Sequence, residues 1–254
     1  MTSHSMRRCV YTALIGGYEQ LNDQPVALLS EIPFICLTDD PELKSTTWEI
    51  RYTPRMLPLD SVRSQRAMKI RPDVYLPEFD ASLYIDNTIL LSQTPELIFE
   101  SYFSAGGFSV PSHSYRESVL DEFEAVAQGC LDHPSRLIEA LERYKLICPE
   151  VLFEKPYWAA ILIRDHRHPL IHGINEFWLS QVLQYSRRDQ LSLNRTFKEF
   201  GYSPKTIPID NHQSWFHSWP HLSNRRGDIS KFHEETSPNT MKDLLRQLIS
   251  SVKV

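Results

Sequence analysis

The sequence of 254 residues lacks the usual glycine-rich phosphate loops and holds only eight glycines. There is no G-x-G-x-x-G fingerprint, no Walker loop, no G-x-S-x-G elbow and no H-E-x-x-H helix, so the common motifs of dinucleotide, P-loop, serine-hydrolase and zinc-protease sites are absent. Gly16-Gly17 is too short for a dinucleotide fingerprint, although it permits a tight turn after a strand. No repeat and no Gly- or Ser-rich linker divides the chain, which predicts a single domain over residues 1–254.

The sequence also lacks paired cysteines, an excess of positive charge and long apolar runs. Its four cysteines include no C-x-x-C pair, which predicts free thiols in a reducing compartment. The net charge of −5 argues against a nucleic-acid partner. No run approaches the roughly 20 apolar residues of a membrane span, and no signal peptide is visible. We therefore expect a cytoplasmic protein without a transmembrane segment.

Short apolar runs bounded by turns alternate with segments of helical spacing. The predicted strands are residues 9–15, 33–38, 48–53, 83–91 and 157–163. The predicted helices are residues 61–71, 94–103, 116–128, 134–147, 175–185, 188–200 and 241–252. This alternation predicts an α/β fold with a mostly parallel central sheet flanked by helices. Ligands of such sheets bind at the carboxyl ends of the strands.

The most informative polar residue is Asp86, in the run 83–91, which is apolar except for Asp86, Asn87 and Thr88. A buried carboxylate is costly unless a metal, a cation or hydrogen-bond donors satisfy it. Asp86 therefore either binds a divalent ion or a sugar and ribose, or it caps the turn where the strand ends. The pattern leaves both alternatives open.

A basic helix and a polar segment are the next candidates. Arg63, Arg66 and Lys69 follow one another at a spacing of three, which places them on one side of a helix. They suit a pyrophosphate, or else they form a solvated basic face. Asp189 and Gln190 stand at a helix start, where Asp189 either caps the helix or binds sugar hydroxyls.

Three further side chains are candidates for the same site. Glu176, one helix earlier than Asp189, is a candidate base or stabilising group. His217 and His221 are four apart, although Trp219-Pro220 between them argues against a regular helix. Either histidine is a candidate to complete an ion site begun at Asp86, and the alternative is that both are ordinary hydrogen-bonded histidines.

Four segments in this order resemble a known family. They are VYTALIGGYEQL, PFICLTDD, SVRSQRAMKIRP and SLYIDNTI, and WAAILIRDHRH and FWLSQVLQYSRRDQLSL follow them. The match spans roughly residues 9–195. The family was first catalogued as a domain of unknown function and includes bacterial proteins and mucilage-associated plant proteins proposed to be glycosyltransferases.

The resemblance implies a GT-A type, Rossmann-like glycosyltransferase fold, with residues 9–91 as the nucleotide-binding half and residues 92–254 as the helical and acceptor-side half. It implies an enzyme that moves a sugar from a nucleotide-diphosphate sugar, most simply a UDP-sugar, to a glycan or other hydroxyl acceptor, as in polysaccharide biosynthesis. The alternatives are a non-catalytic nucleotide-sugar or glycan-binding module and a metal-dependent nucleotidyltransferase.

The resemblance also assigns expected roles to individual residues. The nucleotide-binding residues would be Thr12, Ala13, Gly17, Tyr18, Asp39, Arg63, Arg66 and Lys69. Asp189, Gln190 and Glu176 would shape the sugar pocket. Asp86 would begin the Asp-x-Asp motif that binds Mn²⁺ or Mg²⁺, but Thr88 stands where the second aspartate is expected. Either Asp86 holds a weakened metal site or the basic cluster replaces the ion.

Overall fold

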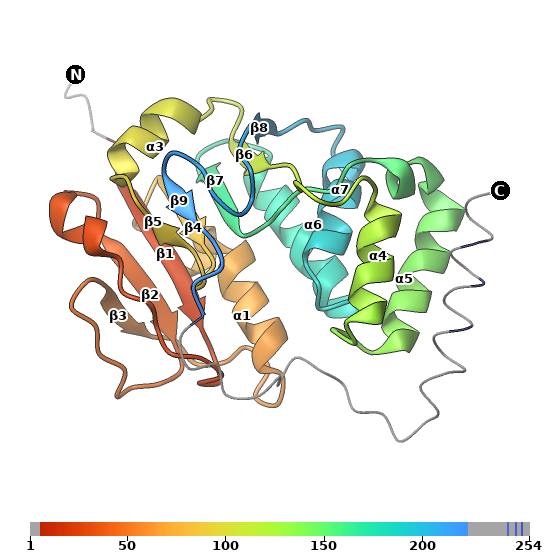
Figure 1. Cartoon of the computed structure of the whole chain (residues 1–254), viewed down its shortest axis with the longest axis horizontal. Coiled ribbons are helices and arrows are strands. Elements are labelled where there is room, and N and C mark those ends of the chain that lie inside the picture. Colours follow the sequence, from red (N-terminus) through yellow and green to blue (C-terminus); the bar gives the residue numbers. More distant parts are fainter. Residues whose placement is uncertain (1–5, 223–242, 244–246, 248–249, 251–254) are drawn as a thin grey trace.

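The computed structural model describes residues 6–222 together with Asp243, Gln247 and Ser250. A seven-stranded sheet with the order β3-β2-β1-β4-β7-β6-β8 forms its centre (Figure 1). The strands are β1 (Arg8–Leu14), β2 (Phe34–Thr38), β3 (Glu49–Tyr52), β4 (Ala81–Ile85), β6 (Phe108–Pro111), β7 (Ile161–Asp165) and β8 (Lys205–Ile207). β7 runs antiparallel to β4 and β6, and all other neighbours in the sheet are parallel. The predicted α/β fold with a mostly parallel sheet is confirmed.

Helices cover both faces of this sheet and extend beyond its β8 end (Figure 1). They are α1 (Ser61–Ile70), α2 (Pro72–Tyr75), α3 (Pro95–Tyr102), α4 (Val119–Gln128), α5 (Pro134–Ile147), α6 (Ile171–Gln184) and α7 (Gln190–Glu199), with 3-10 turns η1 (Pro25–Leu29) and η2 (Pro149–Phe153). β5 (Leu90–Leu91) and β9 (His217–Ser218) form a small antiparallel pair. No helix of the described residues is long and apolar enough to cross a membrane.

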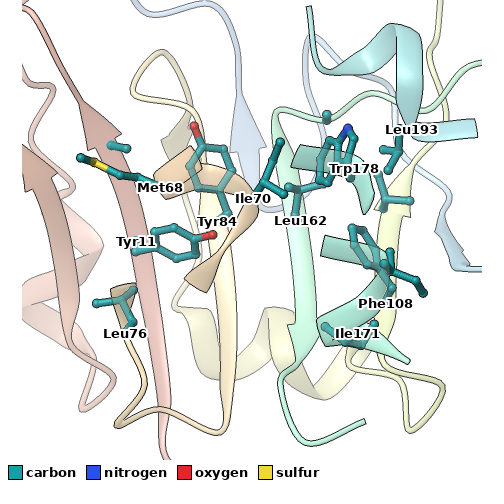
Figure 2. Packing of buried hydrophobic residues seen from close by; sticks show 14 of the residues in the cluster. Tyr11, Met68, Ile70, Leu76, Tyr84, Phe108, Leu162, Ile171, Trp178 and Leu193 are labelled. Carbon is teal, nitrogen blue, oxygen red and sulfur yellow. The ribbon is translucent and has the colours of Figure 1, made fainter. Parts of the chain in front are cut away.

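The inner strands β1, β2, β4, β6 and β7 are buried on both faces, as in parallel sheets generally, whereas the edge strands β3 and β8 are more exposed. In β1, Tyr11 and Ala13 belong to a core that includes Met68 of α1 and Trp178 of α6 (Figure 2). Alternate β1 residues such as Val10 point to the opposite face. That second core also contains Ile98 and Phe99 of α3 and Leu91 of β5. The two-sided burial explains why β1, β2 and β4 were recognisable as apolar runs.

Several predicted boundaries were wrong. Residues 83–91 do not form one strand, because β4 ends before Asp86 and the backbone turns, with Ile89 N donating to Asp86 O (2.9 Å). The helix predicted from residue 116 begins at Val119, because Ser118 and Asp121 form a capping box. The short strands β6 and β8 were not predicted. The predicted helix 241–252 lies outside the described residues apart from Asp243, Gln247 and Ser250.

Candidate functional site

A cavity of about 440 Å³ lies at the carboxyl ends of β1 and β4. Ile15 follows β1 on its wall, Asp86 follows β4, and the opposite wall is built from α4 and the start of α7. This is the edge of a parallel sheet at which ligands are expected. The volume falls within the range of small-molecule sites. The charged residues that line it are Glu19, Arg66, Lys69, Asp86, Arg116, Glu122, Arg187, Arg188 and Asp189.

Asp86 is held by two neighbours and remains partly open to the cavity. The Tyr84 hydroxyl donates a hydrogen bond of 2.6 Å to Asp86 Oδ1. Burial raises the pKa of Tyr84 well above its ordinary value, and the nearby Asp86 charge raises it further, so this donor stays protonated. Lys69 Nζ lies 3.4 Å from Asp86 Oδ1. With 32% of its side chain exposed, Asp86 still has oxygen surface available to a ligand.

Asp189 is the centre of a buried ion cluster with two cations of α1. Lys69 Nζ lies 2.7 Å from Asp189 Oδ2, and Arg66 Nε lies 2.8 Å from Asp189 Oδ1. The side chains of Lys69 and Asp189 are only 2% and 4% exposed. Burial alone would raise the pKa of Asp189, but the charges of Arg66 and Lys69 outweigh it and hold the pKa at about 2. Asp189 is therefore ionised throughout the neutral range.

The cluster decides between the two interpretations of Asp189. The residue occupies the N-cap position of α7, but its side chain makes no capping hydrogen bond. Its carboxylate points to α1 instead, so capping does not explain it. Charged groups are expensive to bury even when paired, and strongly perturbed carboxylates in cavities are often functional.

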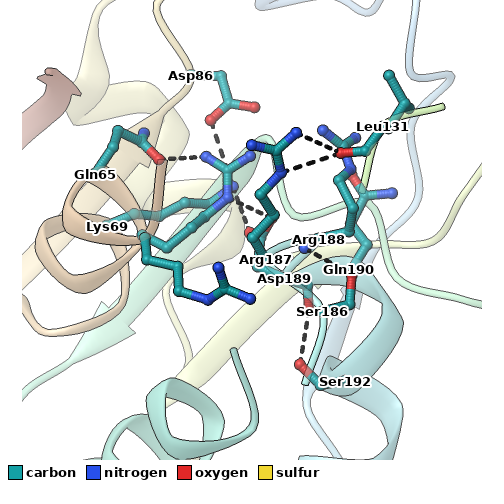
Figure 3. Close-up of polar contacts among 12 residues, drawn as sticks. Gln65, Lys69, Asp86, Leu131, Ser186, Arg187, Arg188, Asp189, Gln190 and Ser192 are labelled. Carbon is teal, nitrogen blue, oxygen red and sulfur yellow. Dashed lines mark hydrogen bonds and ion pairs between the residues drawn. The ribbon is translucent and has the colours of Figure 1, made fainter. Parts of the chain in front are cut away.

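Arg188 brings a further positive charge to the cavity from the α6–α7 connection. Its Nε is buried and has no hydrogen-bond partner among the described residues. Next to it, Gln190 Nε2 donates to Glu122 Oε1 (3.3 Å). In Figure 3, Arg188, Asp189 and Gln190 gather beside Lys69 and Asp86, although more than a hundred positions separate the two groups in sequence. Of the predicted nucleotide and sugar residues, Tyr18, Arg66, Lys69, Asp86, Asp189 and Gln190 line the cavity.

The other predicted nucleotide-binding residues do not line the cavity. Asp39 pairs with Arg55 and accepts a hydrogen bond from Gly16 N (2.9 Å), so it joins the loops after β1 and β2. Arg63 donates to the Val182 and Tyr185 carbonyls and ties α1 to the end of α6. Three more, all on β1 or directly after it, are absent from the cavity lining: Thr12, Ala13 and Gly17.

Glu176, His217 and His221 also lie off the cavity wall. The Glu176 side chain is 67% exposed on α6, with His172 Nε2 at 3.9 Å. His217 is buried and bonds Ser214 Oγ and the Asn211 carbonyl through its two ring nitrogens. His221 Nε2 shares a hydrogen bond of 2.8 Å with Ser218 Oγ. These contacts agree with hydrogen-bonded histidines rather than with ligands of an ion at Asp86.

The residues around Asp86 fit a divalent cation poorly. Within the described ranges, no three His, Cys, Asp or Glu side chains are grouped as metal ligands. Thr88 Oγ1 accepts a hydrogen bond of 3.0 Å from Trp219 Nε1. Asn87 Nδ2 donates to Glu19 Oε1 (3.0 Å). Asp86 is thus the single acidic residue of its turn, whereas hard cations require several oxygen ligands.

The sequence did not single out the far wall of the cavity. Glu122 of α4 and His113, Tyr115 and Arg116 of the β6–α4 loop line this wall, together with Trp158 and Trp219. One signal was available, because Glu122 lies between apolar residues on the buried side of α4. A carboxylate at a core position of an amphipathic helix indicates a polar site, as Asp86 did in its strand.

Comparisons with known proteins address the fold. No protein-family model and no curated protein matches the sequence. Among solved structures, the WbbM bifunctional glycosyltransferase is similar, with a TM-score of 0.51 at 8% identity over 82% of this chain and 39% of that one. Glycosyltransferase GlyE of Streptococcus pneumoniae TIGR4 has a TM-score of 0.43 at 12% identity, over 80% of this chain and 45% of that one. Mouse xyloside xylosyltransferase 1 has a TM-score of 0.44 at 8% identity, over 80% of this chain and 85% of that one.

The chain spans less than half the length of WbbM and of GlyE. The likeness to WbbM shows that the chain has a glycosyltransferase-like α/β fold, which agrees with the GT-A type expected from the sequence. At this identity, the likeness concerns the fold alone.

Proposed function

We propose that the protein transfers a sugar from a nucleotide-diphosphate sugar, and specifically a UDP-sugar, to a glycan or other hydroxyl acceptor. The main support is one observation: Arg66, Lys69 and Arg188 converge with two carboxylates on a cavity at the carboxyl edge of a glycosyltransferase-like sheet. Fold alone never defines an activity, so the proposal depends on this combination of charges.

The cations suit the diphosphate of the donor. As the acceptor oxygen bonds to the anomeric carbon, the bond from that carbon to the β-phosphate oxygen breaks and the nucleoside diphosphate leaves with additional negative charge. The acceptor hydroxyl releases its proton to solvent in the same reaction. Fixed cations in a buried site stabilise such developing charge. Arg66 and Lys69 are held in place by Asp189, so these two cations are positioned before the donor binds. Arg188 Nε has no hydrogen-bond partner among the described residues and would be available to a phosphate oxygen.

The carboxylates suit hydroxyl groups. An ionised carboxylate is purely an acceptor, so Asp86 would accept hydrogen bonds from the sugar or ribose hydroxyls. Asp189 would keep Lys69 and Arg66 in position. Gln190, the next residue, would contact the donor sugar. Ile15 and Tyr18, which follow β1 and line the cavity, would contact the base.

Replacing Asp86 with Ala tests this assignment. Loss of one hydrogen bond to a charged group is worth about 1.5–3 kcal/mol, so transfer is expected to fall at least about tenfold. The measurement is release of UDP from a panel of UDP-sugars in the presence of acceptor glycans. The matched control is Asp80→Ala, an aspartate that precedes β4 and is absent from the cavity lining. Undiminished transfer by Asp86→Ala would refute the role of Asp86. If the wild type binds UDP but turns over no UDP-sugar with any acceptor, the non-catalytic binding module is the correct function.

We further propose that donor binding does not depend on a divalent ion, because Thr88 is bonded to Trp219 and Asp86 has no acidic neighbour in its turn. The dissociation constant for UDP is expected to change less than about twofold between EDTA and millimolar Mn²⁺ or Mg²⁺. Isothermal titration calorimetry in each buffer measures it. A tenfold or larger gain in affinity on adding Mn²⁺ would show that the metal alternative is right.

A further inference from the structure

The far end of the cavity holds a second polar group, centred on Glu122, that shares only Gln190 with the proposed donor contacts. Glu122 is only 5% exposed. Its Oε1 accepts from Gln190 Nε2 (3.3 Å), and its Oε2 lies 3.2 Å from Arg116 Nε and 3.8 Å from His113 Nε2. All four side chains line the same cavity as Asp86 and Lys69.

Helix packing alone does not require a carboxylate at this position. On α4, the neighbouring Phe123 and Val126 belong to the core shared with α5. Burial raises the pKa of Glu122, and the charges of Arg188 and Arg116 oppose that rise. A well-packed apolar residue at such a position would often be as stable as a buried ion pair. The arrangement instead resembles a binding site, because a carboxylate, an amide and a guanidinium supply the acceptors and donors that sugar hydroxyls need.

Aromatic side chains complete this end of the cavity. Trp158 and Trp219 meet edge to face with their ring centroids 5.5 Å apart. Tyr115 stacks on His212 at 5.3 Å, and His212 lies 5.2 Å from Trp219. The hydrogen bond from Trp219 to Thr88 fixes the indole over the cavity. Aromatic walls around a few convergent polar groups are characteristic of small-molecule sites, and the C–H faces of a pyranose ring fit such walls.

We propose that Glu122, Arg116, Gln190, Tyr115 and Trp219 form an acceptor subsite that binds a pyranose ring. This inference rests on the proposed function, because an acceptor subsite has meaning where a donor binds next to it. Gln190 follows Asp189 directly and contacts Glu122, so the subsite begins where the Asp86–Lys69–Asp189 cluster ends. Tyr115 is 41% exposed, so the subsite opens to solvent, where the end of a glycan enters. Thr88, at the place of the second metal aspartate, would serve this subsite by holding Trp219.

Saturation-transfer NMR on the full chain tests the proposal. The probes are methyl β-D-glucopyranoside, methyl α-D-mannopyranoside and methyl α-D-galactopyranoside, each with and without saturating UDP. The wild type is expected to transfer saturation to at least one of these pyranosides in the presence of UDP. Tyr115→Ala and Glu122→Gln are each expected to weaken its binding about fivefold or more. The matched control is Tyr52→Ala, which removes a 62% exposed tyrosine of β3 that is absent from the cavity lining.

Each outcome separates the subsite from the donor site. If UDP binds and no pyranoside does, the subsite proposal is wrong and the proposed function stands. Pyranoside binding that both variants leave unchanged also overturns the subsite. If UDP-glucose displaces the pyranoside and UDP does not, these residues bind the donor sugar, which contradicts the acceptor assignment. If a pyranoside binds through Tyr115 and Glu122 but UDP does not bind, the subsite is supported and the proposed function fails. An unchanged circular dichroism spectrum of Glu122→Gln excludes misfolding as the cause of a lost signal. Tyr115→Ala is the milder variant, because it changes a residue at the surface.

Discussion

Replacing Asp189 with Asn is expected to lower the free energy of unfolding by about 3–5 kcal/mol, because removing one partner of a buried ion pair leaves uncompensated charge. The charges left behind would be those of Lys69 and Arg66, whose side chains are 2% and 15% exposed. Asp86 lies 3.4 Å from Lys69 and compensates it only in part. Urea unfolding of the wild type and the variant at pH 7 measures the difference.

The same substitution has a defined pH dependence. The pKa of Asp189 is about 2 in the folded protein and 3.8 for an ordinary aspartate. Because the folded-state pKa is depressed, its contribution is fully present above about pH 4 and is lost as the pH falls through 2. The stability difference between wild type and Asp189→Asn should therefore shrink between pH 4 and pH 2.

A matched control is Glu78→Gln, which removes a 40% exposed carboxylate from its pair with Arg51. Exposed pairs contribute about 0–1 kcal/mol, so little change is expected. If Asp189→Asn costs no more than Glu78→Gln, the buried cluster has no special energetic role.

Replacing Arg188 with Ala is expected to weaken UDP binding about 30- to 100-fold, which corresponds to about 2–2.7 kcal/mol for charge-assisted hydrogen bonds to phosphate. Arg188 Nε has no hydrogen-bond partner among the described residues, but the charge of Arg188 also favours the ionised forms of the buried Glu122 and Asp189. A lower thermal midpoint is therefore expected beside the loss of UDP affinity, and calorimetry at a temperature where the variant is folded separates the two effects.

The control for Arg188 is Arg143→Ala on the exposed face of α5, which removes the same charge from a site outside the cavity. Titration calorimetry with UDP at two salt concentrations compares the two variants. A loss shared by both would indicate a general electrostatic effect of net charge, and an unchanged UDP affinity for Arg188→Ala would contradict the assignment of the diphosphate position.

The sequence predicted the parallel sheet because β1, β2 and β4 are short apolar runs buried on both faces. It also identified Asp86, because a carboxylate inside such a run is conspicuous. It could not predict which basic residues of α1 face the cavity. A spacing of three rotates successive side chains by about 60° around a helix, and Arg63 turns to the carbonyls of α6 while Arg66 and Lys69 meet Asp189.

The far wall of the cavity was harder to recognise. In the sequence, Glu122 looks like an ordinary polar residue of an amphipathic helix, and its hydrogen-bond partner Gln190 lies 68 positions away. Such a contact depends on tertiary packing and leaves no local pattern. For His217 and His221, the local pattern was present and the predicted site was not found. Their spacing is typical of metal ligands, but each ring is hydrogen-bonded to a residue nearby in the chain.

The central claim is that the cations at the edge of β1 and β4 bind a nucleoside diphosphate. Titration calorimetry of the wild-type chain with UDP and with UMP, both in EDTA, tests it most directly. The cluster of Arg66, Lys69 and Arg188 predicts that UDP binds at least about tenfold more tightly than UMP, because the β-phosphate gains charge-assisted hydrogen bonds worth about 1.4 kcal/mol or more. Equal affinities for UDP and UMP, or no binding of UDP, would contradict it.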